Sequence, residues 1–163
     1  MIMPAHKTAK VFVAYSHLDA RFRHELEDQL TLLAKKGHLE WWSEQQLIPG
    51  EEVVAALADK IQEADLILLL VSIHFLSDDF CWSQQLEKAI ERHDNGEAVV
   101  IPVFVRPCAW EGTPIEKLQG VPPKGKAISS WSDKHEGWTQ AARGIQKALA
   151  AWSKKQQGDG ADA

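Results

Sequence analysis

Leu66-Ile67-Leu68-Leu69-Leu70-Val71 is apolar at every position. A strand with one solvent-facing side alternates apolar and polar residues, whereas a strand covered on both faces is apolar throughout. The run is too short to cross a bilayer, which requires about 20 apolar residues. It therefore predicts the central strand of a parallel sheet that lies between two layers of helices.

Strand-like and helix-like segments alternate along the rest of the chain, which is typical of an α/β domain. Further strands are expected at 11–15, 39–42, 98–105 and 127–129. The helices between them are predicted by inward-facing apolar residues at helical spacing: Phe22, Leu26, Leu30 and Leu33; Val54, Leu57 and Ile61; Trp82, Leu86, Ala89 and Ile90; Trp138, Ala141, Ala142, Ile145, Ala148, Leu149 and Trp152.

The order of these segments predicts a flavodoxin-like fold, in which a five-stranded parallel sheet of order 2-1-3-4-5 carries helices on both faces. In such sheets ligands bind at the carboxyl ends of the strands, where the chain direction reverses. We therefore expect a site formed by the loop after Tyr15, the loop after Trp42 and the segment that follows Ser72.

Length and composition indicate one folded domain. The chain has 163 residues, of which 45% are hydrophobic and 25% are charged, enough for one substantial core but not for two. We expect an N-terminal extension over 1–9, the domain over 10–152, and a polar, disordered tail or linker over 153–163.

Charge and cysteine usage argue against several classes of function. The net charge is −5 with scattered basic residues, which disfavours direct binding of nucleic acid. Cys81 and Cys108 are too few for a disulfide scaffold and form no CxxC pair for zinc, so no metal site is expected. The absence of a long apolar stretch predicts a cytoplasmic protein with no contact to membranes.

Two catalytic-looking patterns have simpler explanations. Gly120 to Lys126 has the spacing of a phosphate-binding P-loop, but Ala127 follows where the magnesium ligand is required, so a surface connection is expected. Cys81 with His74 or His93 would make a thiol nucleophile and its base, yet free cysteines are commonly small buried hydrophobes.

A third pattern combines Ser16, His17 and Asp19, which are the residue types of a hydrolytic triad. Triads assemble across a fold, so this spacing carries no weight. The simpler interpretation is a loop at the end of a strand, with Asp19 as the cap of the first helix.

An ordered series of motifs resembles the TIR (Toll/interleukin-1 receptor) domain family over residues 10–152. Val11 to Asp19 resembles its first box, and Leu39 to Glu44 with Ile48 to Glu52 resembles its second strand and mobile loop. The remaining motifs resemble the third strand, the start of the site helix, and the bacterial form of the fourth strand and its loop: 66–71, 75–77, 80–82, 99–103 and 106–110.

The resemblance implies an enzyme that breaks the nicotinamide–ribose bond of NAD. Bacterial TIR domains hydrolyse NAD or cyclise its ADP-ribose part, commonly as effectors of antiphage defence, and NAD is then the substrate rather than a cofactor. The family's catalytic glutamate lies four residues after an aromatic-Cys step, and counting from Phe80-Cys81 gives Gln85. Glu87 is rotated by about 200° from this position on a helix and cannot replace it.

Glutamine keeps the shape of glutamate but lacks its charge. A carboxylate stabilises the oxocarbenium-like ribose as the bond breaks, which accelerates the reaction. A unit charge at about 4 Å contributes roughly 4 kcal/mol at an effective dielectric of about 20, or roughly a thousandfold in rate. We therefore expect impaired turnover, either in a natural binder or in a form whose glutamate was replaced to trap substrate, and the near-isosteric exchange favours the second.

The resemblance also implies the surroundings of Gln85. A mobile loop, Ser43–Gly50, would gate the pocket and mediate self-association, and a regulatory domain or partner protein would control the assembly. The residues expected around the ribose, at the gate and on the far wall are Tyr15, Ser16 and His17; Trp42 and Glu44; Ser77, Cys81 and Trp82.

Two other functions fit the same fold. A non-catalytic adaptor would use its loops only to contact other TIR domains. A phosphate-receiving regulator is disfavoured, because Val71-Ser72-Ile73-His74 places no acceptor aspartate at the end of the central strand. The enzymatic interpretation requires the amide of Gln85 to face a cleft; a place in the hydrophobic interior would leave only the architecture.

Overall fold

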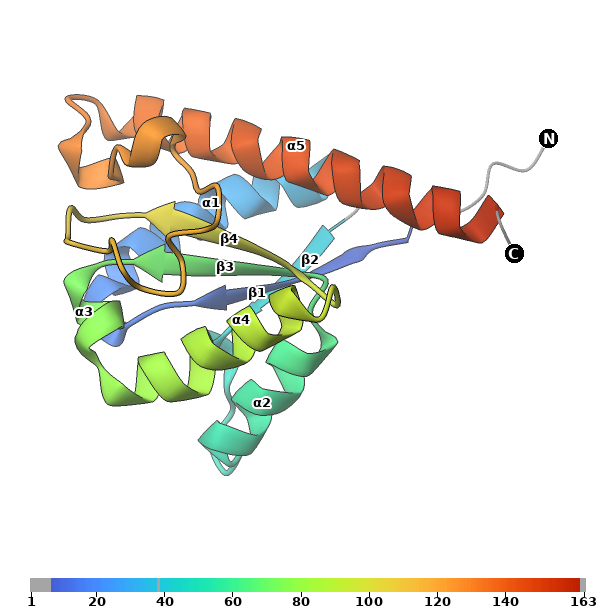
Figure 1. Cartoon of the computed structure of the whole chain (residues 1–163), viewed down its shortest axis with the longest axis horizontal. Coiled ribbons are helices and arrows are strands. Elements are labelled where there is room, and N and C mark those ends of the chain that lie inside the picture. Colours follow the sequence, from blue (N-terminus) through green and yellow to red (C-terminus); the bar gives the residue numbers. More distant parts are fainter. Residues whose placement is uncertain (1–6, 38, 162–163) are drawn as a thin grey trace.

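Four parallel strands form the sheet in a computed structural model that describes residues 7–37 and 39–161 (Figure 1). Their spatial order, β2-β1-β3-β4, agrees with the first four positions of the predicted sheet. The bounds are Ala9–Ala14 for β1, Leu39–Ser43 for β2, Leu66–Val71 for β3 and Val99–Phe104 for β4.

Helices cover both faces of the sheet. α1 and α5 pack on one face, and α2 and α4 pack on the other (Figure 1). The α-helices are α1 (Ala20–Lys35), α2 (Val53–Glu63), α3 (Ile73–Ser77), α4 (Glu87–Asp94) and α5 (Lys134–Ala161). Shorter turns are η1 (His17–Asp19), η2 (Glu44–Gln46), η4 (Pro123–Gly125), η5 (Ile128–Ser130) and the π-helix η3 (Cys81–Leu86), which continues into α4.

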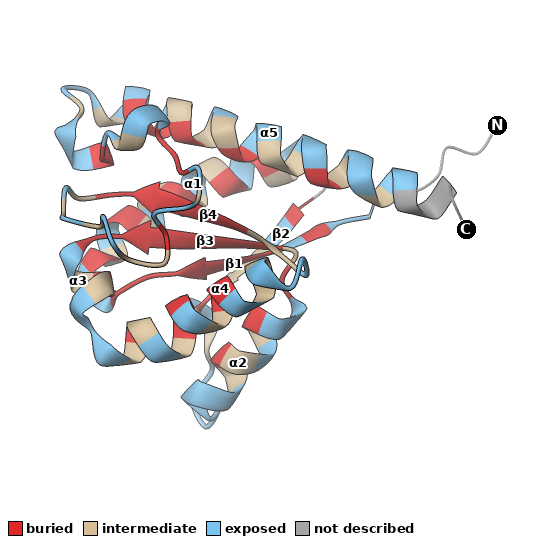
Figure 2. Ribbon diagram, viewed as in Figure 1, coloured by how far each residue is buried: buried red, intermediate tan, exposed pale blue. Residues whose placement is uncertain are grey.

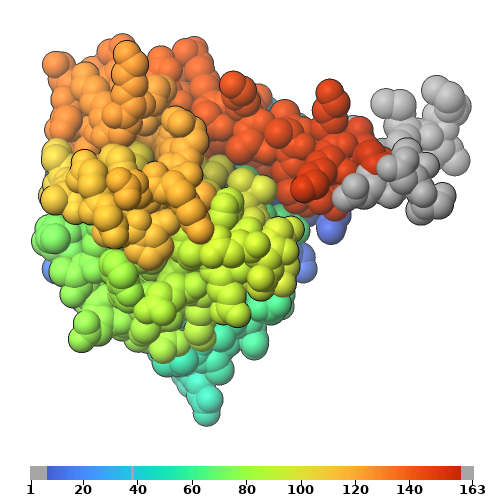
Figure 3. Space-filling view, viewed as in Figure 1, coloured from blue at the N-terminus to red at the C-terminus, as the bar shows by residue number. Residues whose placement is uncertain are grey.

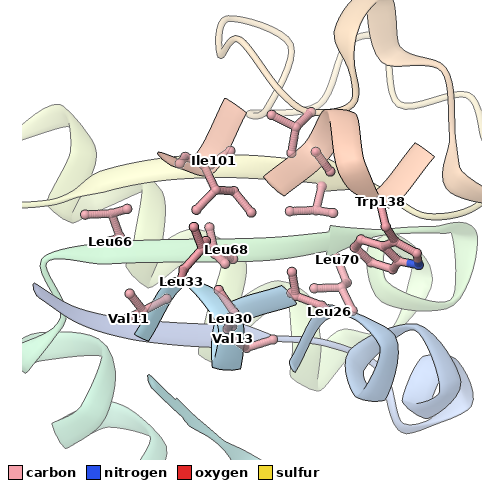
Figure 4. Packing of buried hydrophobic residues seen from close by; sticks show 14 of the residues in the cluster. Val11, Val13, Leu26, Leu30, Leu33, Leu66, Leu68, Leu70, Ile101 and Trp138 are labelled. Atoms are coloured by element: carbon pink, nitrogen blue, oxygen red, sulfur yellow. The ribbon is translucent and has the colours of Figure 1, made fainter. Parts of the chain in front are cut away.

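β3 is the central strand that its sequence predicts, and all its residues are fully buried (Figure 2). Leu66, Leu68 and Leu70 belong to the core beneath α1 and α5, and Figure 4 shows them in succession along β3, with Leu70 beside Trp138. The intervening residues of β3 belong to the opposite core, because successive side chains of a strand point to opposite faces. An uninterrupted apolar run is therefore what this position requires.

The predicted fifth strand is absent from the described part of the chain. Residues 128–130 form η5, and the outer edge of β4 pairs only with Val121, through an isolated bridge to Val103. Pro122 and Pro123 follow Val121 and have no N–H to donate, so the pairing cannot extend.

The prediction of a disordered tail is wrong for residues 153–161, which continue α5 to Ala161. Trp152 is only 8% exposed and packs against the core, which anchors this part of the helix. Residues 162–163 lie outside the described residues, as do residues 1–6 of the expected extension.

The inward direction predicted for Val54 is also wrong, because this side chain is 49% exposed. Leu57 and Ile61 face the core as expected, and Val54 lies on the first turn of α2, beyond the reach of the sheet.

Candidate functional site

The carboxyl ends of β1, β2 and β3 bring three segments of the expected site to one edge of the sheet. Tyr15 to His17 follow β1, and Glu44 follows β2. β3 leads through α3 into η3, which contacts β1, α2 and α3. The segments that were expected to form the site therefore meet at the predicted edge of the sheet.

Gln85 lies on η3 in the interior, with only 2% of its surface exposed. Its amide Nε2 donates a hydrogen bond to Cys81 Sγ at 3.7 Å, and its amide oxygen accepts no hydrogen bond from the described residues. A sulfur acceptor is weak. The amide oxygen is not among the fully enclosed, unpartnered side-chain atoms of the described chain, which are Arg23 Nε and Ser43 Oγ, so it retains contact with solvent. Gln85 is therefore largely enclosed in the isolated chain, and its position at a cleft stays a prediction.

Cys81 is 5% exposed, and burial, together with the nearby Asp78 carboxylate, raises the pKa of its thiol to about 12. The thiol is therefore neutral near pH 7, whereas a nucleophilic cysteine must be a thiolate. This environment argues against the pairing of Cys81 with His74 or His93 as nucleophile and base. Cys81 instead packs in the core beneath α2 and α4.

Ionisable side chains near Cys81 influence one another. His17 is exposed, and its charge acts to lower the pKa of Glu44 and, to a smaller extent than hydrogen bonding, that of Asp78. Burial outweighs this effect for Glu44, so the pKa of that carboxyl is raised. The pKa of Asp78 is lowered chiefly because its carboxylate accepts the backbone N–H of Cys81, at 2.8 Å. Asp78 was not anticipated, although an acid three residues before a helical residue is a recognisable capping signal.

Tyr15 and Ser16 have structural partners. The Tyr15 ring lies on the side of α1, 5.4 Å from the Arg23 guanidinium, and burial raises the pKa of its hydroxyl. Ser16 is 4% exposed, and its Oγ accepts the backbone N–H of Leu18 at 3.3 Å, which caps η1. Neither residue presents an open surface to a ligand.

Within the described residues, Gln85 makes no hydrogen bond to Trp42, Ser77 or Trp82. Trp42 stacks on Phe12 at 5.7 Å and lines a cavity of about 270 Å³ between β2 and α2. Ser77 is exposed and donates its hydroxyl to the Ile73 carbonyl at 2.6 Å. Trp82 is half-buried and packs against the core of its own face.

A buried ion pair at the same edge escaped the sequence analysis. Asp19 is fully buried, and its side chain makes no capping bond to α1, so the predicted cap is wrong. Its carboxylate instead accepts hydrogen bonds from Ser72 Oγ and from Arg106 Nε, the latter at 2.7 Å. The three residues follow β1, β3 and β4, so this network ties together the ends of three strands.

The remaining predictions concern the P-loop-like segment, a metal site and a membrane span. Gly120 packs so closely that a Cβ would lie 2.4 Å from the Phe104 ring, and the N–H of Val121 bonds to the Pro102 carbonyl, so this segment serves the sheet edge rather than a phosphate. Within residues 7–37 and 39–161, no three His, Cys, Asp or Glu side chains are grouped to hold a metal. None of the described helices is long and apolar enough to span a membrane.

Comparisons with known proteins identify the family. Residues 11–150 match the family model for the TIR domain. An uncharacterized protein, y4lF, of Sinorhizobium fredii (strain NBRC 101917 / NGR234) is 41% identical over 138 residues, which make up 85% of this chain and 43% of that protein. The chain therefore spans less than half the length of this relative.

Two solved structures share the fold. The crystal structure of the TIR domain of the Toll-related receptor TRR-2 from Hydra magnipapillata has a TM-score of 0.62 and 16% identity, covering 88% of this chain and 99% of that chain. The TIR domains of the activated Roq1 resistosome, which directly recognizes the pathogen effector XopQ, have a TM-score of 0.52 and 17% identity, covering 93% and 99%. At these identities the similarity concerns the fold alone.

Proposed function

The chain belongs to the TIR domain family, and we propose that it acts by associating with other TIR domains through the segment that joins β2 to α2. This segment, residues 44–54, is called the β2–α2 loop below and includes the first turn of α2. The proposal keeps the expected self-association and makes it the primary function of the isolated domain.

The exposed apolar side chains of the β2–α2 loop carry this proposal. Of the six large hydrophobic side chains that are strongly exposed in the described chain, three lie here: Ile48 (65% exposed), Val53 (42%) and Val54 (49%). The segment projects from the body of the domain, as the cyan tip of Figure 3 shows. Apolar groups gathered on a projection are a common mark of a protein–protein contact. Nothing in the core requires them to be apolar.

The interior around Gln85 supports association over catalysis by the isolated chain. A catalytic group must contact the reacting atoms, and Gln85 is 2% exposed. The residue is uncharged, and its neighbour Cys81 is a neutral thiol because its pKa is raised to about 12. Neither group supplies the negative charge that would strongly stabilise a developing positive charge on ribose.

Cleavage of NAD by the assembled protein is the second candidate function. Two observations favour it: the amide oxygen of Gln85 accepts no hydrogen bond from the described residues, and His17, Glu44 and Asp78 lie near Cys81 or near one another. Contact between neighbouring β2–α2 loops would move Glu44 and open this interior. A role as an effector of antiphage defence is what the family resemblance implies for such an activity.

Sedimentation equilibrium tests association. Ile48→Ser combined with Val54→Ser should weaken self-association at least tenfold, because it removes apolar area from the contact. Leu32→Ser is the matched control, since Leu32 is 54% exposed but lies on α1. Equal association of the double variant and the wild type would reject the β2–α2 loop as the contact.

Consumption of NAD tests the second function in the dispersed and in the assembled protein. Gln85→Glu should raise cleavage at least a hundredfold on assembly, because it restores the carboxylate. Gln84→Glu, one residue away, controls for the added charge. An assembled Gln85→Glu variant that leaves NAD intact would exclude cleavage at this site without affecting the case for association.

A further inference from the structure

Three cationic side chains gather around one buried phenylalanine. Phe22 on α1 is fully buried, and its ring centroid lies 4.9 Å from Cζ of Arg106, 5.3 Å from Cζ of Arg21 and 5.7 Å from Nζ of Lys134. These cations come from the segment after β4, the first turn of α1 and the first residue of α5. They are called the Phe22 cation cluster below.

Only one of the three cations of this cluster forms an ion pair within the described residues. Arg106 is paired with the buried carboxylate of Asp19. Arg21 and Lys134 make no ion pair with any residue of the described chain. Two like charges held close together repel each other, and at the protein surface the repulsion is only partly screened. Arg21 and Lys134 are therefore available to attract an anion from solution.

Two acids near the cluster in sequence accept hydrogen bonds from other groups. Glu25, one turn along α1, accepts the indole N–H of Trp138 at 3.2 Å. Asp133 precedes α5 and accepts the backbone N–H of His135 at 2.9 Å. Neither carboxylate forms an ion pair with the cluster.

Arg106 is positioned to receive an anion. Its Nε donates to Asp19 at 2.7 Å, and its Cζ lies 4.9 Å from the centroid of the Phe22 ring, so two contacts hold the guanidinium. Its side chain is nevertheless 39% exposed, and its terminal amino groups donate no hydrogen bond within the described residues. A guanidinium held in this way presents paired donors, a geometry that suits phosphate oxygens.

Two helix N-termini reinforce the charge. α1, with 16 residues, and α5, with 28 residues, begin beside the cluster, and each helix start carries a partial positive charge. They add to the attraction that the three side chains create.

We propose that the Phe22 cation cluster is a binding site for a phosphate-bearing anion. Arg106 supplies paired hydrogen bonds, and Arg21 and Lys134 supply charge from two other elements. The site belongs to the α1 and α5 face, whereas Cys81, the neighbour of Gln85, packs on the opposite face of the sheet. It is therefore independent of the function proposed above.

Calorimetric titration with inorganic pyrophosphate tests the site. The wild-type protein should bind with a Kd below the millimolar range, and Arg21→Ala with Lys134→Ala should weaken binding at least tenfold. Lys35→Ala with Lys155→Ala removes the same charge from exposed positions outside the cluster and should change the Kd less than twofold. An equal loss in both double variants would show diffuse attraction and would overturn the site, as would the absence of binding to the wild type.

Thermal unfolding provides a second readout. Pyrophosphate should raise the Tm of the wild type and of the Lys35/Lys155 variant but leave that of the Arg21/Lys134 variant unchanged, since only bound ligand stabilises. A similar Tm increase in all three proteins would overturn the proposal. If the Arg21/Lys134 variant does not fold, Arg21→Gln and Lys134→Gln are compared singly against the same control.

Discussion

Asp19 and Gln85 are both buried polar side chains near the carboxyl ends of the strands, but they differ in the number and strength of their hydrogen bonds. The carboxylate of Asp19 is fully buried and accepts hydrogen bonds from both Ser72 and Arg106. The amide of Gln85 is 2% exposed and has one weak bond, to the sulfur of Cys81. A buried charge persists only when it is paired, whereas a neutral amide tolerates poor bonding at a smaller cost.

This difference in hydrogen bonding indicates that the carboxyl edge of the sheet has a rigid part at Asp19 and a more easily rearranged part at Gln85. The Asp19 network joins the ends of β1, β3 and β4, so any motion there would break strong bonds. The Gln85 amide would lose only its weak bond to Cys81 if it turned outward. A rearrangement on assembly would therefore take place on the side of Gln85.

Removal of the Asp19 carboxylate should have the largest effect. Asp19→Ala leaves the Arg106 guanidinium and the Ser72 hydroxyl without their partner, and we expect a loss of about 3 kcal/mol in the free energy of unfolding. Urea unfolding measures it, with the exposed Asp28→Ala on α1 as the control. A loss below about 1 kcal/mol would contradict the assignment of a strong buried pair.

Alkylation of Cys81 measures how firmly the Gln85 region is closed. The pKa of this thiol is raised to about 12, so its thiolate is scarce near pH 8. We expect iodoacetamide to modify it at least a hundredfold more slowly in the folded chain than in urea, since reaction requires local opening. The Cys108→Ser variant assigns the signal. Comparable rates in the two states would mean that the region is already open.

Gln85→Glu should destabilise the isolated chain at neutral pH by about 2 kcal/mol, because a carboxylate would lose its hydration there. Burial raises the folded-state pKa of the introduced carboxyl above its unfolded value. Stability relative to the wild type is therefore retained below the unfolded pKa and is lost as pH rises through the folded pKa. Unfolding at several pH values tests this, with Gln84→Glu as the control. A pH-independent difference would contradict burial of the group.

Gln85→Met should have the smallest effect. It removes a single weak hydrogen bond and keeps a side chain of similar length, so we expect a change in stability below about 1 kcal/mol. The same urea experiment measures it. A loss as large as that of Asp19→Ala would show that the amide is firmly bonded and would remove the contrast between the two residues.

The sequence predicted the framework of the domain because periodicity is a local property. The apolar run Leu66 to Val71 identified the central strand, and spacing on α1 and α5 identified the faces that pack on the sheet. The strand order β2-β1-β3-β4 followed from the alternation of elements. The continuation of α5 to Ala161 and the reduction of a fifth strand to the bridge at Val121 were missed. Polar composition does not exclude a helix, and an apolar triplet does not ensure a strand.

Part of the site edge was also predictable, because parallel strands end together: Tyr15, His17, Glu44 and Cys81 lie close enough to influence one another's pKa or that of a shared neighbour. The sequence by itself determined which segments meet there. Only the tertiary structure decided that Gln85 is enclosed, that Asp19 pairs with Arg106, 87 positions away, and that three cations surround Phe22. Such contacts depend on how the layers pack against one another, and the spacing of residues along the chain does not encode the distance between residues of different layers.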